Sequence, residues 1–416
     1  MDLDVVVITN SPGELSSWVR VTVERVRARA PEARIVVMLV PCPYASGREA
    51  EIAHSFPEVD MVLSPGEFLL HLAGLPGGER YQPAPRGVVV FLGGDYWHAL
   101  LMARKLRYAS VAYTDRASSW GRFFTHICVA SPRQKQDIAA AGVPADKISV
   151  VGNLMVEGVR PSLEREEAFR GWGLDPDVLT VGLFPGSRLY HVQTSLSVFL
   201  SVAEDLVREL PRVQFALGLS PFLTVEELEG CLKAQPWPYL RGSGGELQRE
   251  DGVLRVVTDE GVRIPVIQKR QYDLMNQSDL LLTIPGTNTA EIACLGKPMV
   301  VAMTWRARIP RGGPGALISL LPVGSALRRR LLMGILTRIR FTALPNQIAQ
   351  REVVPEVRAE HAAVEISRVV LDLLQNEARR AEMGQELRSL MGSTGASDRV
   401  AEIVLSTARE KECMAS

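Results

Sequence analysis

The chain has 416 residues, of which 46% are hydrophobic and 23% charged, and its 47 basic and 47 acidic residues give no net charge. This balance excludes a largely disordered chain and a generally basic nucleic-acid-binding protein, and the length favours two domains. The aromatic content of 6% disfavours binding of sugars or single strands along an aromatic groove.

The five cysteines are widely spaced and contain no C-x-x-C pair, so the sequence predicts neither a disulfide framework nor a zinc site. No uninterrupted apolar run reaches the roughly 18 residues needed to cross a bilayer. The first apolar run follows acidic residues and is too short for a secretory signal. We therefore expect a cytoplasmic protein in a reducing compartment.

Short apolar runs alternate with helix-length amphipathic segments in the first part of the chain. The run 5–9 ends in the turn signal Asn10-Ser11-Pro12-Gly13 and precedes a predicted helix over 16–29. Continuous Val/Ile/Leu runs separated by helices indicate a parallel sheet covered on both faces, so residues 1–160 are predicted to form a Rossmann-like, doubly wound α/β domain. Its further strands are predicted at 34–40, 61–63, 87–92, 110–113, 126–130 and 148–151.

The alternation of predicted strands and helices begins again after a charged segment with a Gly/Pro/Asp cluster. Residues 161–375 are therefore predicted to form a second Rossmann-like domain. We expect a cleft between two such domains, in which ligands bind beyond the carboxyl ends of the strands. Residues 376–416 are predicted to be C-terminal helices, which we expect to pack back on the N-terminal domain. The second half is predicted to contain strands at 179–184, 213–219, 254–257, 279–284 and 298–303 and helices at 194–210, 359–376, 378–391 and 397–411.

The strand over 279–284 runs into a glycine turn and the start of a short helix. Gly286, Thr287 and Asn288 would present free N–H groups and the positive end of a helix dipole, which suit the diphosphate of a nucleotide. Glu291, one turn further on, could accept hydrogen bonds from ribose hydroxyls. The alternative is that Thr287 merely caps the helix and Glu291 is a solvated surface residue.

A second strand end, after 179–184, carries Pro185-Gly186-Ser187-Arg188. Gly186 permits close backbone approach, Ser187 can donate to phosphate, and Arg188 offers a bidentate fork. The chain contains no G-x-x-x-x-G-K-[ST] sequence, so this is not a P-loop. A plain turn with a surface arginine is the alternative explanation.

The first domain offers two candidates at strand ends. Asp95 follows the strand over 87–92 and could act as general base toward an acceptor hydroxyl, or could cap the next helix. His98 is better explained as a packed or surface histidine than as a catalytic one. Gly13 places backbone at the same edge, although turn formation alone would also explain it.

The segment from Met303 to Asn346 contains eight arginines and no Asp, Glu or Lys, interleaved with apolar residues. This composition suits an anionic membrane surface or a phosphorylated lipid head. A buried helix whose arginines pair with carboxylates elsewhere is the alternative. The residues predicted to contact lipid are Trp305, Arg306, Arg308, Arg328, Arg329 and Arg330.

Five segments, in order along the chain, resemble motifs of the lipid-A-disaccharide synthase family of inverting glycosyltransferases, which have the two-domain GT-B fold. The likeness covers most of the chain. The matching segments are Phe91-Leu-Gly-Gly-Asp95, Pro185-Gly-Ser-Arg188, Gly286-Thr287 with Glu291, Leu344-Pro-Asn346 followed by Arg351-Glu-Val-Val-Pro-Glu356, and Gly395-Ala-Ser397.

The resemblance implies a UDP-sugar held mainly by the C-terminal half, with Arg188, Gly286, Thr287, Glu291 and Asn346 at the nucleotide. The acceptor would lie near Gly13, Glu14 and Asp95 in the N-terminal half. In the family the donor is UDP-2,3-diacylglucosamine, the acceptor is 2,3-diacylglucosamine 1-phosphate, and a β-1,6 bond forms as UDP leaves. The implied enzyme needs no metal or other cofactor and binds peripherally to the inner face of the cytoplasmic membrane.

Departures from the family pattern concentrate on the acceptor side. Pro12-Gly13-Glu14 stands where the family has Ser-Gly-Asp, Gly152-Asn153 stands where it has Gly-His, and Pro285 replaces a serine. UDP-sugar use is therefore a firmer expectation than lipid A as the product. The alternatives are transfer to another glycolipid acceptor, a UDP-N-acetylglucosamine 2-epimerase, and a binding protein without activity.

Overall fold

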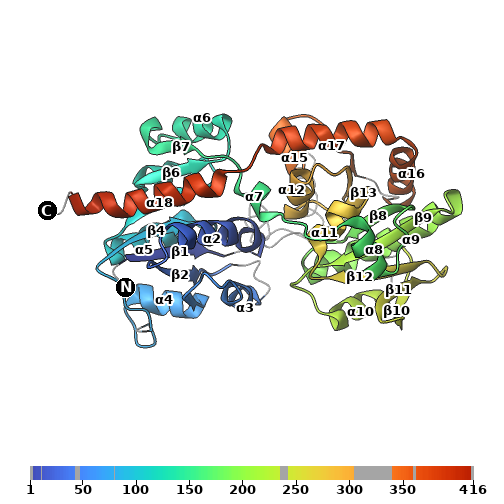
Figure 1. The fold of residues 1–416 in the computed structure, drawn as a ribbon, viewed down its shortest axis with the longest axis horizontal. Helices are drawn as coiled ribbons and strands as arrows, with labels where there is room; N and C mark the ends of the chain where they lie inside the picture. The colour runs from blue at the N-terminus through green and yellow to red at the C-terminus, as the bar shows by residue number, and fades with distance from the viewer. Residues whose placement is uncertain are drawn as a thin grey trace, which may run out of the picture. The chain divides into compact units, whose positions relative to one another are not determined.

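The computed structural model describes residues 3–10, 12–42, 47–78, 80–234, 242–303, 340–358 and 362–413. The chain divides into two compact units. Unit 1 comprises Met1–Gly158 together with Gly392–Ser416, and unit 2 comprises Val159–Met391. Each unit contains one β-sheet with helices packed around it (Figure 1).

Unit 1 contains a seven-stranded sheet in the order β3-β2-β1-β4-β5-β6-β7, and every neighbouring pair is parallel. The order reverses beside β1, so the ends of β1 and β4 form a switch point of the kind at which α/β sheets bind ligands. The strands are β1 (Leu3–Thr9), β2 (Arg34–Leu39), β3 (Met61–Leu63), β4 (Arg86–Phe91), β5 (Ala109–Tyr113), β6 (His126–Val129) and β7 (Ile148–Val150).

The helices of unit 1 lie on both faces of its sheet, as the continuous apolar runs predict. Val5 and Val7 of β1 face a core shared with α2 and α18, whereas Val6 and Ile8 face a second core shared with α4, α5 and α6. The helices are α1 (Pro12–Glu14), α2 (Arg20–Arg29), α3 (Glu49–His54), α4 (Pro65–Ala73), α5 (Tyr96–Leu106), α6 (Pro132–Ala140), α7 (Leu154–Gly158) and α18 (Ala396–Cys413), with a π-helical turn η1 (Leu15–Val19) and 3₁₀ turns η2 (Ser119–Phe123) and η3 (Ala145–Lys147).

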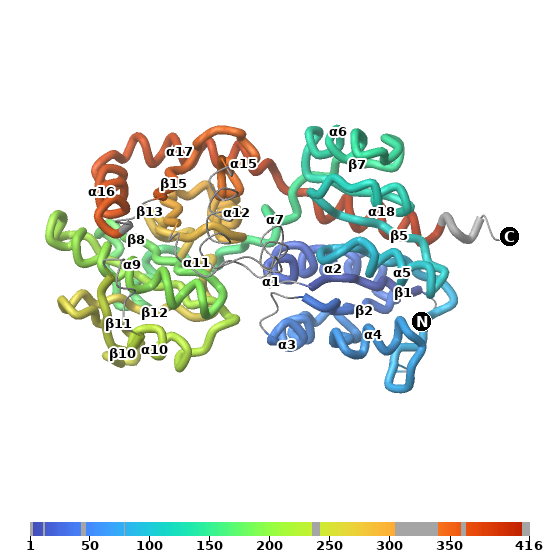
Figure 2. The backbone as a smooth tube through the Cα atoms, turned by 180° about the vertical axis from the view of Figure 1, so that it is seen from behind, coloured from blue at the N-terminus to red at the C-terminus, as the bar shows by residue number. Residues whose placement is uncertain are grey.

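The last helix, α18, joins the first unit although it is the most distant from it in sequence. It packs against α2, β4 and β5, and it lies beside these elements in both views (Figures 1 and 2). Its start is fastened by Glu157, whose Oε1 accepts from the backbone N–H groups of Gly395 and Ser397, each at 3.0 Å. Ser397 also donates its hydroxyl to Glu157 Oε2, at 2.5 Å.

Unit 2 contains an eight-stranded sheet in the order β10-β11-β12-β9-β8-β13-β14-β15. The strands from β12 to β15 are parallel, and β10, β11 and β12 are joined as antiparallel neighbours at one edge. The strands are β8 (Leu179–Phe184), β9 (Val213–Leu219), β10 (Gly245–Glu250), β11 (Val253–Thr258), β12 (Arg263–Gln268), β13 (Leu280–Thr283), β14 (Met299–Ala302) and β15 (Glu356–Val357).

The helices of unit 2 include two that begin directly after sheet strands. Helix α9 follows β8 and starts five residues before the predicted helix over 194–210, and α12 follows β13. The helices are α8 (Arg165–Trp172), α9 (Leu189–Glu209), α10 (Val225–Lys233), α11 (Gln271–Gln277), α12 (Thr287–Cys294), α15 (Leu344–Ala349), α16 (Ala362–Gln375) and α17 (Glu377–Met391).

The predicted division at residue 160 lies two residues from the division between the units, whereas the predicted third part, 376–416, is shared between them. Helix α17 packs on α12, α15 and α16 and so belongs to unit 2, and only α18 belongs to unit 1. The predicted cleft between the domains stays a prediction. Among the described residues, no helix is both long and apolar enough to cross a membrane.

Candidate functional site

The nucleotide-binding candidates of unit 2 lie at the carboxyl ends of two neighbouring parallel strands. β8 and β13 pair with Phe184 opposite Thr283, and each strand leads through a glycine turn into a helix. Gly186 has φ +115°, and a Cβ there would lie 2.7 Å from Ile284 Cδ1. Because the two turns pack this closely, Gly186 cannot be replaced without displacing its neighbour, and the N-termini of α9 and α12 lie at adjacent strand ends.

Arg188 immediately precedes α9. Its carbonyl accepts from the N–H groups of His191 and Val192, and its guanidinium donates to the hydroxyl of Tyr190 at 3.4 Å. Ser187 and Arg188 are both half-buried. The predicted segment Gly186-Ser187-Arg188 therefore leads directly into a 21-residue helix, where free N–H groups and an arginine together suit an anion.

His191 lies against the same turn and was not identified from the sequence. A Cβ on Gly186 would lie 2.9 Å from His191 Cβ. Burial, together with the positive charge of Arg188, lowers the pKa of His191 to about 4, so its ring is neutral at pH 7. Its position three residues after the Pro-Gly-Ser-Arg segment is the signal that could have found it.

The turn before α12 leaves the predicted anion-binding groups accessible. Gly286 has φ +151°, and a Cβ added there would meet no other atom within 4 Å. Gly286 and Thr287 are exposed, and Asn288 is half-buried. Gly286, not Thr287, precedes the helix, and no side chain caps it. The alternative in which Thr287 serves only as a cap is therefore wrong.

Glu291 is buried at 7% exposure, so the alternative of a solvated surface residue is also wrong. Tyr272 of α11 donates its hydroxyl to Glu291 Oε1 at 3.0 Å. Burial raises the pKa of Glu291 to about 7, and the hydrogen bond from Tyr272 opposes only part of this effect. The carboxyl group therefore changes its protonation state near neutral pH. Tyr272 carries no motif that would have marked it in the sequence.

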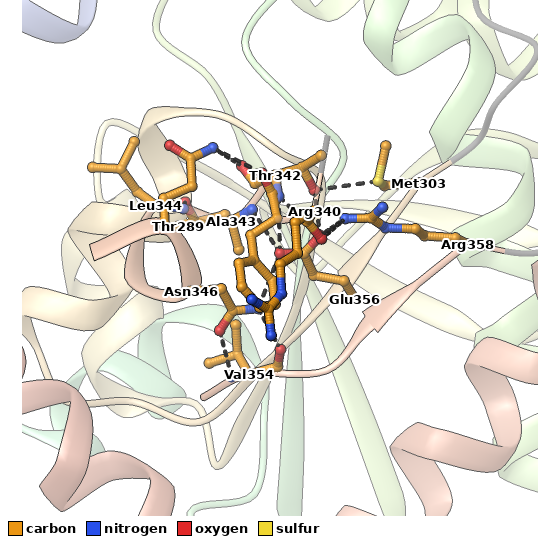
Figure 3. Close-up of polar contacts among 12 residues, drawn as sticks. Thr289, Met303, Arg340, Thr342, Ala343, Leu344, Asn346, Val354, Glu356 and Arg358 are labelled. Carbon is orange, nitrogen blue, oxygen red and sulfur yellow. Dashed lines mark hydrogen bonds and ion pairs between the residues drawn. The ribbon is translucent and has the colours of Figure 1, made fainter. Parts of the chain in front are cut away.

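Asn346 lies in a buried polar network between α15 and β15 (Figure 3). Its Oδ1 accepts from the N–H groups of Val353 at 2.7 Å and Val354 at 2.9 Å. Its Nδ2 donates to the carbonyl of Val354 at 2.8 Å and to Glu356 Oε1 at 2.9 Å. Protein groups thus occupy both donors and both acceptor positions of the amide. This geometry favours a positioning role for Asn346 over the predicted direct contact with a nucleotide.

Glu356 is the acidic centre of this network, with its side chain 3% exposed. It accepts from Thr342, Ala343 and Arg358 as well as from Asn346, as Figure 3 shows. Burial acts to raise the pKa of Glu356, but the hydrogen bonds from Thr342 and Arg358 outweigh it and lower the pKa. The side chain is therefore ionised at neutral pH.

The network continues to the turn before α12. The N–H of Leu344 donates to Thr289 Oγ1 at 3.1 Å, and Thr289 Oγ1 donates to the carbonyl of Gly286 at 2.8 Å. The Glu356 network therefore holds the segment around α15 against the glycine turn that carries the predicted anion site.

The acceptor-side candidates of unit 1 meet at the ends of β1 and β4. Gly93 has φ +134°, and a Cβ there would lie 2.9 Å from Glu14 Cγ. Gly94 has φ +98°, and a Cβ there would lie 3.3 Å from Asn10 Nδ2. The two glycines therefore allow the segment containing Gly13 and Glu14 to pack directly against the turn that leads to Asp95.

Asp95 immediately precedes α5, but its side chain makes no capping hydrogen bond and is 62% exposed. Its Oδ1 lies 4.0 Å from Nη1 of Arg116, an arginine that follows β5. The two side chains line a pocket of about 310 Å³ together with Tyr96, Trp97, Ala117, Ser118 and Trp120. An exposed carboxylate at a pocket is available for proton transfer.

His98 does not share this exposed position. It is 3% exposed, its ring stacks on Trp97 at 3.7 Å, and burial lowers its pKa. The interpretation of His98 as a packed histidine is confirmed.

The predicted lipid contacts Trp305, Arg306, Arg308, Arg328, Arg329 and Arg330 lie outside the described residues. Within the parts of the chain that the structure describes, no group of three or more His, Cys, Asp or Glu side chains could hold a metal ion.

Comparison with protein-family models gives no match. Among curated proteins, the lipid-A-disaccharide synthase of Geobacter sulfurreducens is 31% identical over 297 residues, which cover 70% of this chain and 65% of that protein. The synthase of Geobacter metallireducens is 32% identical over 297 residues, with the same coverage of both chains. The alignment thus spans slightly less than two thirds of the length of these relatives.

Among solved structures, the UDP-GlcNAc 2-epimerase of Neisseria meningitidis bound to UDP-GlcNAc superposes with a TM-score of 0.57 at 13% identity, covering 97% of this chain and 100% of that one. Another UDP-N-acetylglucosamine 2-epimerase gives the same TM-score at 13% identity, with 98% and 96% covered. At such low identity these likenesses establish the fold, which is the predicted GT-B type with two Rossmann-like units.

Proposed function

We propose that this chain, a homologue of the lipid-A-disaccharide synthases, is a glycosyltransferase that moves an acylated glucosamine from a UDP-sugar to a lipid-linked sugar phosphate and releases UDP. The observation that carries the proposal is the pair of glycine turns at the ends of β8 and β13, from which two helices begin side by side. Two helix N-termini with an adjacent arginine are suited to a nucleotide diphosphate.

In the proposed reaction, unit 2 binds the donor. The N–H groups at Gly186, Ser187 and Gly286, the exposed Thr287 and the half-buried Asn288 surround the diphosphate, and Glu291 accepts from the ribose. Arg188 and the helix dipoles stabilise the negative charge that develops on the leaving UDP, which removes the need for a metal ion. Asn346 acts indirectly, by holding α15 and the turn at Gly286 in place.

Unit 1 supplies the acceptor side in this proposal. Asp95 takes the proton from the acceptor hydroxyl as that oxygen attacks the anomeric carbon of the donor. A single in-line displacement of this kind inverts the anomeric configuration. Gly13 and Glu14 belong to the turn packed against Gly93, beside the base. Because the acceptor carries acyl chains, the enzyme works at a membrane surface, peripherally and on the cytoplasmic side.

The test is turnover by the purified full-length chain, with UDP-2,3-diacylglucosamine and 2,3-diacylglucosamine 1-phosphate in detergent micelles. We expect release of UDP and formation of a disaccharide, with activity retained in EDTA. Arg188→Ala and Asp95→Ala should each lower kcat/KM by about 100-fold or more. Arg133→Ala, on the exposed face of α6, is the matched control and should leave kcat/KM unchanged. Failure of a panel of UDP-sugars to bind or react would refute the proposal.

The structural likeness to UDP-GlcNAc 2-epimerases supports a second candidate function. An epimerase acts on the UDP-sugar alone, whereas a transferase also requires an acceptor. Incubation with UDP-N-acetylglucosamine in the absence of acceptor, followed by separation of the two epimers, distinguishes the candidates. Conversion under those conditions would favour the epimerase and contradict the transferase.

A further inference from the structure

The pocket beside Asp95 contains a cation with unused hydrogen-bonding capacity. The backbone of Arg116 is fixed, since its N–H donates to Thr114 Oγ1 at 3.1 Å and its carbonyl accepts from the Tyr96 hydroxyl at 2.7 Å. Its side chain is 67% exposed. Among the described residues, its guanidinium donates one hydrogen bond, from Nη1 to the carbonyl of Gly94 at 3.2 Å. A guanidinium has five N–H donors, so most remain for a ligand.

Large apolar side chains extend from the rim of this pocket. Trp97 and Trp120 line it, at 40% and 52% exposure. Leu101 follows Trp97 by one helical turn on α5 and is 44% exposed, and Phe123 follows Trp120 on η2 and is 58% exposed. The elements α5 and η2 pack against each other, and the rings of Trp120 and Phe123 lie 6.1 Å apart, so we group these four exposed side chains as the α5–η2 strip. The aromatic content of the whole chain is low, so the composition alone does not reveal this local concentration of aromatic side chains.

The charge around the α5–η2 strip is predominantly positive. Between residues 95 and 123, which span the pocket and the strip, the sequence contains five basic residues and two acidic residues, Asp95 and Asp115. All five basic side chains are exposed, and the guanidinium of Arg122 lies 4.8 Å from the centre of the Phe123 ring. Exposed apolar groups beside a pocket that contains an exposed arginine match a molecule with an anionic head and a hydrocarbon tail.

We propose that the pocket lined by Asp95 and Arg116 is the head-group site for a phosphorylated, acylated sugar, with Arg116 binding the phosphate and the α5–η2 strip receiving an acyl chain. Two guanidinium N–H groups can meet two phosphate oxygens at once, which a point charge cannot do. The pocket volume of about 310 Å³ is at the small end of the range for small-molecule sites, so it holds the head group and leaves the chain on the strip. This inference rests on the proposed function and assigns its acceptor specificity to Arg116.

The experiment compares two acceptors in micelles, 2,3-diacylglucosamine 1-phosphate and the same compound without its phosphate, with full-length protein. We expect the wild type to prefer the phosphorylated acceptor and Arg116→Ala to lower kcat/KM for it by about 30- to 100-fold, with little effect on the other acceptor. Arg116→Lys should restore only part of the preference. An equal loss on both acceptors would show a structural role and overturn the assignment.

The apolar strip is tested in the same assay. Trp120→Ala and Phe123→Ala should each raise KM for the acylated acceptor by about tenfold, without changing KM for the UDP-sugar. Leu75→Ala, an exposed leucine outside the strip, should change neither constant. If the strip variants lower only the binding of the protein to anionic phospholipid vesicles, with KM in micelles unchanged, the strip contacts the bilayer instead and the proposal fails.

Direct binding separates this inference from the proposed function. Titration of the wild type and Arg116→Ala with micellar 2,3-diacylglucosamine 1-phosphate, followed by tryptophan fluorescence, requires no turnover. Binding by the wild type and its loss in Arg116→Ala would support the head-group site even if no UDP-sugar reacts. Equal binding by both proteins would overturn the inference, even if the transferase reaction is found.

Discussion

Asn346 illustrates how one polar side chain can fix a loop. Replacement of Asn346 by Ala would leave the N–H groups of Val353 and Val354 without their acceptor and would remove a donor to Glu356. Since each buried unsatisfied group costs about 1–3 kcal/mol, we expect a loss of at least about 3 kcal/mol in the free energy of unfolding. Urea unfolding measures this loss.

The exposed neighbour Gln347 provides the control for this prediction, because its amide donates only to carbonyl oxygens at the surface. Gln347→Ala should cost less than about 1 kcal/mol. A fully stable Asn346→Ala protein with weakened UDP binding would instead indicate direct contact with the nucleotide and contradict the positioning part.

Glu291 predicts a pH dependence of stability. Its pKa is raised by burial from an ordinary value of 4.5 to about 7, so between these values the folded state holds a proton that the unfolded state has lost. Stability from this group is therefore full below pH 4.5 and decreases as the pH rises through 7. Glu291→Gln removes the ionisation and can still accept from Tyr272, so its advantage over the wild type at pH 8 should reach up to about 3 kcal/mol.

Thermal unfolding midpoints between pH 5 and pH 8 measure this effect. The wild type should lose stability over the range more steeply than Glu291→Gln. Glu382→Gln, at an exposed position on α17, should follow the wild-type profile. Parallel profiles for Glu291→Gln and the wild type would show that Glu291 is already ionised throughout the range.

At the scale of elements, α18 depends on the carboxylate of Glu157. This side chain accepts two backbone N–H groups and one hydroxyl at the start of the helix, where free donors would otherwise remain. Glu157→Ala should reduce the free energy of unfolding by about 2–4 kcal/mol and increase amide hydrogen exchange along α18. Both quantities are measured on the full-length protein.

Asp398 offers a comparison at the same helix end, because it forms exposed ion pairs with Arg25 and Arg29. Asp398→Asn should cost less than about 1 kcal/mol, since exposed pairs contribute little. Equal losses for the two variants would mean that surface charge, and not the buried hydrogen bonds, anchors α18.

Element prediction succeeded where strands are buried on both faces. The runs that form β4, β8 and β13 are largely apolar and end in glycine turns, so both the strands and the positions of Asp95, Arg188 and Gly286 could be predicted. β10 was missed because Gly245–Glu250 is a half-exposed edge strand without an apolar run. The turn residues Asp251 and Gly252, both with positive φ, were the available hairpin signal.

The sequence indicated the site residues that follow strands but not those supplied by other elements. His191, Tyr272 and Arg116 reach their positions from a helix turn, a neighbouring helix and a loop, and only His191 has a sequence signal, its spacing of three residues from Arg188. The predicted contact of Asn346 with a nucleotide stays a prediction. The saturation of its hydrogen bonds, which favours a positioning role, depends on backbone groups of Val353 and Val354 that only the fold brings close.

At the scale of the whole molecule, unit 1 is built from both ends of the chain, and unit 2 is one continuous stretch. Val400, Ala401 and Val404 of α18 are fully buried in the same core as Val5 of β1 and Val21 of α2. Removal of residues 392–416 should therefore unfold unit 1 and leave unit 2 folded. Calorimetry of the truncated protein should show one transition in place of two, still shifted upward by UDP if unit 2 binds it.

Removal of residues 409–416 alone is the matched control, since it keeps the buried residues Val400, Ala401, Val404 and Ala408. This shorter truncation should preserve the calorimetric profile of the full chain. A wild-type profile for the longer truncation would show that α18 is dispensable for unit 1.

The contribution of α18 to unit 1 also has a consequence for biosynthesis. A ribosome releases residues 159–391 before it releases the helix that packs against the sheet made from the first 158 residues. The middle of the polypeptide can therefore fold first, while one apolar face of the sheet in the earliest-made residues is only partly covered. Chaperone binding during translation should accordingly concentrate on that partly covered face, and a stalled nascent chain that lacks α18 would be the species most prone to aggregate.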